Sequence, residues 1–531
     1  MTRAARPRCG NGNLEGEVFM NPFANLFYHR PFTGERQSRT VRADLCVYGG
    51  TSAGVAAAVQ AAKSGLRAVI ANPGTHLGGM TSGGLGATDI GNKAAIGGLS
   101  RQFYQHMLEY YAGRNQAQWT FEPHVAESLF TQWTETWKVR VFPESFLSKA
   151  ETSGGKITRL VMENGLRFEA PVFIDATYEG DLMAAAGVSY RVGREANSLY
   201  RETLDGVYFG HPDHSFETWV DPFRVEGKPD SGLVWGVSEE EPGFQGQGDG
   251  RVQAYNFRIC LSKDPDRLPF PEPPAYDPGK YELLARYIRS GVWDAMGLNT
   301  PLPNGKTDLN NHGAVSTDMI GFSRGWPDGD YETRERIFQE HFNYDLGMLY
   351  FLANDRRVPE EIRAQAGGWG LPRDEFTRTG GWPHQLYIRE ARRMVSDYVV
   401  TESDCRHLRA AKDPVALAAY TMDSHHCRRV VLDGRCVNEG NVEVRPTSPY
   451  GISYRSIVPA RGECGNLLVP VCLSASHIAY GSIRMEPVFM VLGQSAATAA
   501  ALALEGGCAV QDVDYGLLRK KLLADGQILE W

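Results

Sequence analysis

Residues 44–72 read DLCVYGGTSAGVAAAVQAAKSGLRAVIAN, and this stretch decides the fold. The apolar run Leu45–Tyr48 predicts a strand, and the glycines after it predict a tight turn. The small residues of Ala53–Ser64 then predict a helix, and Arg67–Ala71 predicts a second strand. This βαβ unit is of the kind that places a dinucleotide pyrophosphate at the N-terminus of its helix.

Each position of the glycine turn has its own role. Gly49 allows the tight turn, and Gly54 lets the helix pack closely on the strand. Thr51 replaces the usual middle glycine, and it permits a backbone approach to phosphate if its side chain points away. Asn72 replaces the usual acidic residue at the ribose, and its amide can still hydrogen-bond a hydroxyl. The predicted contacts of this unit are Gly49, Gly50, Thr51, Ser52, Ala53, Gly54 and Asn72. An ordinary βαβ unit without ligand is the alternative.

Two further segments are typical of a cofactor site. Residues 76–98 read HLGGMTSGGLGATDIGNKAAIGG, and so many glycines outside a linker predict backbone close to a flat ligand. The short strand Val172–Ile174 ends in small and acidic residues, where a dinucleotide-fold sheet meets its cofactor. The candidates from these segments are Gly78, Gly79, Met80, Ser82, Gly83, Gly84, Asp175, Ala176, Thr177 and Asp181.

The composition excludes several classes of protein. A net charge of −8 with no long basic run argues against nucleic acid or an anionic membrane as partner. Nine cysteines without a CxxC pair indicate reduced thiols rather than disulfides or zinc. The N-terminus has no apolar signal-peptide core, and the apolar run Val488–Leu504 contains Gln494 and predicts a buried helix. We expect a soluble cytoplasmic protein, and an oligomer is left open.

The order of segments predicts an α/β protein whose Rossmann-like cofactor domain is interrupted. We expect a flexible N-terminal arm over 1–40 and the first part of the cofactor domain over 41–195, with a β-meander within 138–170. Residues 196–440, rich in aromatics, proline and charge, predict an inserted α+β substrate domain. Residues 441–531 complete the cofactor domain. An interrupted cofactor domain indicates a flavoprotein, because nicotinamide dehydrogenases usually keep theirs contiguous.

Local patterns predict the elements of the later segments. Helices are expected near 279–290, 329–354 and 384–401. Leu467–Cys472 predicts a strand, Ser474–Arg484 a polar loop, and the residues from Met485 to about Leu504 a long helix. Pro487 suits the first turn of that helix, and Glu486 suits the positive end of its dipole.

Four stretches together resemble a known family. They are YGGTSAGVAAA (48–58), HLGGMTSGGLG (76–86), GGWPHQLYIREARRM (380–394) and VCLSASHIAYGSIRMEPVFMVLGQSAATAA (471–500). Two further stretches carry the same resemblance: KTDLNNHGAVSTDMIG (306–321) and YTMDSHHCRRV (420–430). The chain resembles the FAD-dependent oxidoreductases that are often labelled xanthan-lyase-like. The resemblance implies FAD in a glutathione-reductase-like fold, with Thr51 as a family trait and Asn72 as a departure. It does not give the substrate.

The long helix is the predicted flavin edge. In flavoproteins of this architecture, a helix N-terminus faces the N1–C2=O edge of the flavin and stabilises negative charge there. The flavin-edge candidates are Ser482, Ile483, Glu486, Pro487 and Val488. Arg484 either adds a full positive charge or pairs with a local carboxylate such as Glu486. His76 is a further candidate flavin ligand, either without a covalent bond or through one to the ring methyl.

Histidines supply the candidate base. Oxidation of a C–H bond that bears a hydroxyl or amine needs a base for the heteroatom proton, and histidine suits this role. His425 and His426 are adjacent, so on a strand only one of them would face the site, and we favour His425. His477 is either a flavin or substrate contact or a structural histidine. No metal site is expected, because no third ligand lies at a useful spacing.

The basic stretch 384–393 contains the remaining candidate residues. His384 and Arg389 can bind a carboxylate or sugar hydroxyls, and Arg389, Arg392 and Arg393 can equally form a solvated helix face. The resulting hypothesis is an FAD-dependent oxidoreductase that takes hydride from a small polar organic substrate, such as a sugar or glycoside. Electrons then pass to oxygen or another acceptor. The alternatives are a flavin-containing isomerase or lyase without net redox, an NAD(P)-dependent enzyme and a non-enzymatic binding module.

Overall fold

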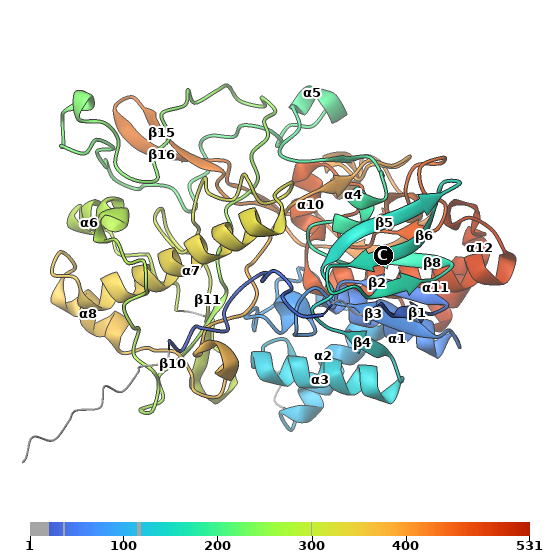
Figure 1. Ribbon diagram of the computed structural model, residues 1–531. Coiled ribbons are helices and arrows are strands. Elements are labelled where there is room, and N and C mark those ends of the chain that lie inside the picture. Colours follow the sequence, from blue (N-terminus) through green and yellow to red (C-terminus); the bar gives the residue numbers. More distant parts are fainter. Residues whose placement is uncertain (1–20, 36–37, 114–117, 299) are drawn as a thin grey trace, which may run out of the picture.

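The computed structural model describes residues 21–35, 38–113, 118–298 and 300–531. Figure 1 shows two halves, with the parallel sheet and its helices on the right and a loop-rich half around one long helix on the left. The predicted flexible arm over 1–40 falls partly outside the described residues. Residues 21–34 differ from that expectation, because Phe23, Leu26 and His29 are buried against the rest of the chain.

A five-stranded parallel sheet forms the centre of the right half. Its order is β19-β8-β2-β3-β4, and every neighbouring pair is parallel. The strands are β2 (Leu45–Tyr48), β3 (Ala68–Ala71), β4 (Arg140–Phe142), β8 (Val172–Asp175) and β19 (Leu467–Leu468). Because β19 comes from the end of the chain, the last segment completes a sheet that the first segment begins. The protein is therefore mixed α/β with a parallel, Rossmann-like sheet.

Two helices pack closely against each other beside this sheet (Figure 1). They are α1 (Ser52–Lys63) and α11 (Glu486–Gly506). A Cβ added to Gly493 of α11 would lie 2.2 Å from the carbonyl oxygen of Ala53, so only glycine allows this approach. Among the described residues, α11 is the helix long and apolar enough to span a membrane, but 89% of its most apolar window is buried inside the protein. That burial is typical of a core helix.

A second sheet covers one side of the first. Its order is β1-β7-β6-β5, formed by β1 (Thr40–Arg42), β5 (Leu147–Ser153), β6 (Lys156–Met162) and β7 (Arg167–Glu169). Strands β5 to β7 are the predicted meander, whereas β4, expected in the same meander, joins the parallel sheet instead. Figure 1 shows β5 and β6 in front of β2 and β8.

The left half is built around α7 (Tyr331–Asn354), which agrees with the helix predicted at 329–354. Helix α6 (Glu282–Arg289) agrees with the one predicted near 279–290. The other elements of this half are α8 (Glu360–Gly367), β10 (Ile259–Ser262), β11 (Lys306–Leu309), β15 (Arg428–Leu432) and β16 (Arg435–Glu439). Pairing here is by short two-stranded sheets such as β10–β11 and β15–β16.

The helix predicted at 384–401 is wrong. This segment is extended, and its β12 (Arg393–Met394) pairs antiparallel with β9 (Tyr190–Arg191). The alternative of a solvated basic face is wrong too, because Arg389, Arg392 and Arg393 are buried. Each of these guanidinium groups meets a carboxylate that lies far away in the sequence.

The segment before α11 also differs from its prediction. The strand expected over 467–472 is only β19, and the loop expected over 474–484 contains helix α10 (His477–Ile483). Ser476 caps α10 by accepting from the N–H of Ala479. The remaining helices are α2 (Gly98–Tyr110), α3 (Pro123–Thr136), α4 (Asp181–Ala185), α5 (Asn197–Tyr200), α9 (Glu402–Cys405) and α12 (Tyr515–Ala524). The remaining strands are β13 (Pro414–Ala418), β14 (Met422–Ser424), β17 (Val442–Val444) and β18 (Tyr450–Ser453).

The α1–α11 contact gives a direct stability prediction. Gly493→Ala should lower the free energy of unfolding by about 1–3 kcal/mol, the usual cost of overpacking, although alanine favours helices. Gly506→Ala is the matched control, because its Cβ would lie 3.5 Å from the nearest atom, Cys508 Sγ. Urea unfolding of both variants measures the difference. Equal midpoints for Gly493→Ala and the unchanged protein would contradict the tight contact.

Candidate functional site

A cavity of about 650 Å³ lies at the carboxyl ends of the parallel strands. Its walls include Gly49, Gly50 and Thr51 after β2, residues 72–76 after β3, and residues 177–179 after β8. The N-terminus of α1 therefore begins at this cavity, since Thr51 is its N-cap. The volume lies within the range of small-molecule sites, and the position is where open α/β sheets bind ligands.

The glycine turn leaves its backbone open to the cavity. The Oγ1 of Thr51 donates to the carbonyl of Ala176 at 2.7 Å and accepts from the N–H of Gly54 at 3.2 Å. This side chain is thus turned toward the segment after β8, as a phosphate site with threonine at this position requires. A Cβ on Gly54 would lie 2.0 Å from the carbonyl oxygen of Gly49, which explains the glycine there. These features fit the diphosphate of a dinucleotide.

Asn72 holds the turn in place. Its Oδ1 accepts from the N–H of Gly50 at 2.9 Å, and its Nδ2 donates to the carbonyls of Gly74 and His76 at 2.9 and 2.8 Å. An aspartate here would lose both donors and would face two carbonyl oxygens with its charge. This explains why asparagine replaces the acidic residue. Toward a ribose, Asn72 can offer only the remaining lone pair of Oδ1.

The second glycine-rich segment packs mainly against protein. A Cβ on Gly83 would lie 2.4 Å from Gln385 Cβ, and a Cβ on Gly84 would lie 2.0 Å from the carbonyl oxygen of Arg258. These glycines therefore allow close approach of other parts of the chain. Of the predicted glycines in this segment, Gly79 is the one that lines the cavity. Gly83 and Gly84 thus have protein neighbours, and the contact of this segment with a flat ligand stays a prediction.

Glu486 connects the cavity wall with α11. Its buried carboxylate accepts from the hydroxyls of Ser52 at 2.5 Å, Thr81 at 2.8 Å and Tyr178 at 2.7 Å. Tyr178 lines the cavity, so the first residue of α11 lies directly behind that wall. Burial raises the pKa of Glu486, and the three hydroxyls oppose that shift. Arg484 does not pair with Glu486 but with Asp423.

The predicted cofactor residues divide into two groups by position. Those that line the cavity are Gly49, Gly50, Thr51, Asn72, Gly79, Thr177 and Asp181. Those absent from the lining are Ser52, Ala53, Gly54, Gly78, Met80, Ser82, Gly83, Gly84, Asp175, Ala176, Ser482, Ile483, Glu486, Pro487 and Val488. The Asp175 carboxylate accepts from Thr177 and Met183, and burial raises its pKa to about 6. The contacts of both groups with a cofactor stay predictions.

A buried charged cluster lies beyond the cavity, and we define it as Asp318, Arg389, Asp423, His425 and Arg484. His425 Nδ1 lies 2.7 Å from Asp318 Oδ2, and Nε2 lies 3.7 Å from Asp423 Oδ2. The guanidinium of Arg389 lies 2.8 Å from Asp318, and that of Arg484 lies 3.1 Å from Asp423. Burial alone would raise the pKa of Asp423, but His425 and Arg484 outweigh it and bring the pKa to about 2. Burial would likewise raise the pKa of Asp318, but Arg389 and His425 outweigh it and lower that pKa.

One segment leads from the cavity to this cluster. His384 and Gln385 line the cavity, Tyr387 OH accepts from Arg484 at 2.7 Å, and Arg389 reaches Asp318. The ring of His384 stacks on His76 with centroids 3.7 Å apart, so the two histidines lie together at the cavity. Burial and His76 lower the pKa of His384 well below its ordinary value. Asp318 and Tyr387 were missed by sequence reasoning, although both lie in stretches that carry the family resemblance.

The candidate histidines His477 and His426 lie outside the charged cluster. His477 lies between Glu390 at 2.7 Å from Nδ1 and Ser424 at 3.0 Å from Nε2, so protein groups use both ring nitrogens. His426 Nε2 donates to the carbonyl of His214 at 3.1 Å, and burial lowers its pKa to about 3. These contacts favour structural roles for His477 and His426. Of the adjacent pair, His425 is the one in the charged cluster.

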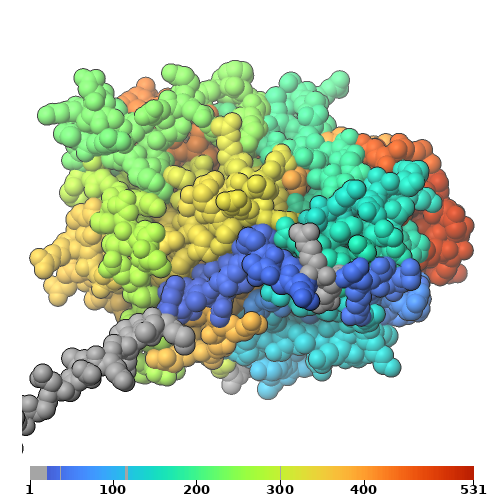
Figure 2. Space-filling view, in the orientation of Figure 1, coloured from blue at the N-terminus to red at the C-terminus, as the bar shows by residue number. Residues whose placement is uncertain are grey.

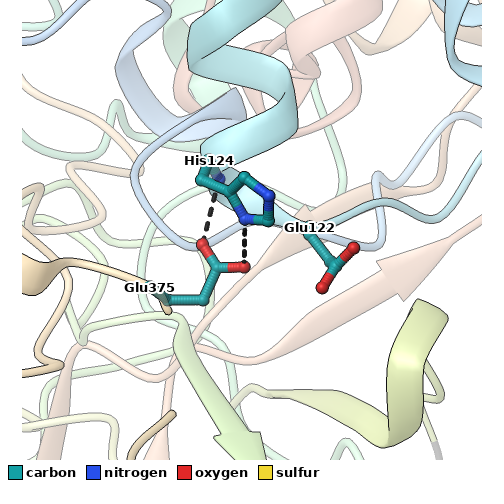
Figure 3. A group of neighbouring side chains, drawn as sticks. All are labelled: Glu122, His124 and Glu375. Carbon is teal, nitrogen blue, oxygen red and sulfur yellow. Dashed lines mark hydrogen bonds and ion pairs between the residues drawn. The ribbon is translucent and has the colours of Figure 1, made fainter. Parts of the chain in front are cut away.

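Glu122, His124 and Glu375 form the group of possible metal ligands in Figure 3. Glu375 accepts from the backbone N–H of His124 at 3.0 Å and lies 2.7 Å from its Nδ1. The ammonium of Lys306 lies 2.6 Å from Glu122 and 2.7 Å from Glu375. Lys306 thus already supplies the positive charge that these carboxylates need, and the group is an ion-pair network.

Comparison with known proteins assigns the family. The family model described as FAD dependent oxidoreductase matches residues 44–522. Among solved structures, L-amino acid deaminase from Proteus vulgaris is 15% identical over 32% of this chain and 54% of its own, with a TM-score of 0.24. L-proline dehydrogenase from P. horikoshii is 12% identical over 30% of this chain and 59% of its own, with a TM-score of 0.23. No curated protein sequence matches the chain. The family match covers nearly the whole chain, which therefore belongs to the FAD dependent oxidoreductases. The chain spans just over half the length of the two solved structures named above.

Proposed function

We propose that this enzyme takes hydride from a small polar organic substrate, such as a sugar or glycoside, and passes the electrons to oxygen or another acceptor. The observation that carries the proposal is His425, which lies buried between two carboxylates in a cluster joined to the cavity by residues 384–389. FAD supplies the hydride acceptor at its N5 atom. The residues of the chain supply binding, orientation and proton transfer.

His425 is placed to act as the general base. Asp318 accepts a hydrogen bond from Nδ1, which fixes the ring and leaves Nε2 as the nitrogen that takes the substrate proton. The imidazolium that forms lies between the carboxylates of Asp318 and Asp423. Arg389 and Arg484 help keep these carboxylates ionised, so both can stabilise that charge.

Unpartnered donors support a polar substrate. Among the described residues, the buried Nε atoms of Arg389 and Arg484 have no hydrogen-bond partner. A buried N–H without a partner costs free energy, so an acceptor on the substrate would stabilise it. Hydroxyl and carboxylate oxygens are such acceptors, and a carboxylate or sugar fits this requirement.

Replacing His425 tests the proposed base. His425→Ala should retain FAD and slow reduction of the flavin by substrate by roughly two to four orders of magnitude, the usual scale for loss of a general base. The measurement is anaerobic stopped-flow absorbance with candidate polyols, sugars and hydroxy acids. His407→Asn, an exposed histidine bonded to Ser448, is the control and should behave as the unchanged protein.

Two outcomes would contradict this proposal in different ways. Unchanged reduction kinetics in His425→Ala would remove His425 from the mechanism. Turnover of a substrate without persistent bleaching of the flavin under anaerobic conditions would favour the isomerase or lyase alternative.

Glu179 gives a pH dependence of cofactor binding. It lines the cavity, and burial raises its pKa to about 7, while Arg334 opposes the shift and Asp181 adds to it. Below that pKa the carboxyl is neutral, and above it the carboxylate repels the diphosphate of FAD. Affinity for FAD should therefore fall by roughly 3- to 10-fold from about pH 6 to about pH 8. FAD titrations of Glu179→Gln should show a flatter profile, and an equally steep one would exclude Glu179 as the cause.

A further inference from the structure

The N-terminal segment of the described chain lies across the cofactor cavity. We call residues 21–34 the strap. Figure 2 shows this blue segment lying along the front of the molecule between the yellow α7 and the teal meander. Nine of its residues line the same cavity as the glycine turn, among them Tyr28, Arg30 and Phe32. The strap therefore forms one wall of the site that begins at α1.

The strap is anchored on both halves of the protein. On the side of α7, the N–H groups of Tyr28 and His29 donate to Glu335 at 2.6 and 2.9 Å, and Gln339 donates to the carbonyl of Leu26 at 2.9 Å. On the side of the meander, His29 Nε2 lies 2.8 Å from Glu163. These contacts hold the strap over the cavity.

Arg30 stands out among the charged side chains that line the cavity. Of the residues that the structure describes, four with carboxyl groups line the cavity: Glu144, Glu163, Glu179 and Asp181. Among the described residues that line it, Arg30 is the only arginine or lysine. A diphosphate that enters this cavity brings further negative charge, and the α1 N-terminus offers only about half a positive charge in return.

Arg30 is free to meet such a group. Within the described part of the chain, its guanidinium contacts the strap itself, by donating to the carbonyl of Ala24 and lying 3.9 Å from the ring centroid of Phe27. Among the described residues it has no carboxylate partner. Arginine binds phosphate oxygens through paired N–H groups, and Arg30 lines the same cavity as the glycine turn.

We infer that the strap is part of the FAD site and that Arg30 is the counter-ion of the FAD diphosphate. The inference rests on FAD binding in this cavity. Cofactor entry and exit then require the Glu335 anchor to loosen, because the strap forms a wall over the bound group. Arg30 is a binding residue, and Glu335 is a positioning residue that acts through the strap.

The test is the rate at which purified full-length holoprotein releases FAD after dilution, followed by the rise of flavin fluorescence. Arg30→Gln should release FAD about 10- to 100-fold faster, the scale of a charge-assisted phosphate contact, and Arg30→Lys should fall between. Added sodium chloride should speed release from the unchanged protein more than from Arg30→Gln. Arg42→Gln, on the exposed Arg42–Glu169 pair, is the matched control and should release FAD at the unchanged rate.

A second variant tests the strap itself. Glu335→Ala removes the anchor without changing a residue that lines the cavity, and it should also speed FAD release. Glu340→Gln, on the same helix and paired with Arg336, is its control. Release from Arg30→Gln at the unchanged rate, including no release from either protein, would overturn the inference while leaving the family assignment intact. A chain that binds no FAD at all would overturn both.

Discussion

The carboxylate of Glu486 joins three segments that are far apart in the sequence, through the hydroxyls of Ser52, Thr81 and Tyr178. A buried carboxylate is stable only when such donors satisfy it, so these segments must meet for the domain to close. Glu486 begins α11, and Gly493 lets that helix lie against α1. This contact joins the last part of the chain to its first βαβ unit, and the cavity begins at the N-terminus of the same α1.

The charged cluster depends on the same closure. Arg484 precedes α11 by two residues and reaches Asp423 and Tyr387 from there. Residues 384–389 then connect Tyr387 with the cavity on one side and with Asp318 on the other. The cavity and the proposed base are thus parts of one buried framework, in which His425 follows β14 and the cavity lies at the ends of the parallel strands.

The sequence predicted those parts of the fold whose signal is local. The strand Leu45–Tyr48, the helix after it and the helix α7 have periodicity and capping residues of their own. The helix expected at 384–401 failed because the partners of its arginines, such as Asp181 and Glu195, lie about 200 residues away and hold the chain extended. The spacing of apolar residues gives no information about such long-range ion pairs. Asn72 and Thr51 were recognised as departures from the common turn, but only the structure shows the hydrogen bonds that explain them.

A crystal structure of the FAD complex tests the central claim most directly. We expect the diphosphate at the turn Gly49–Thr51 and the flavin ring directed toward the start of α11 and Tyr387. A substrate-sized space should then separate the ring from His425. A flavin ring directed away from residues 384–389, with the charged cluster sealed from it by protein, would contradict the account.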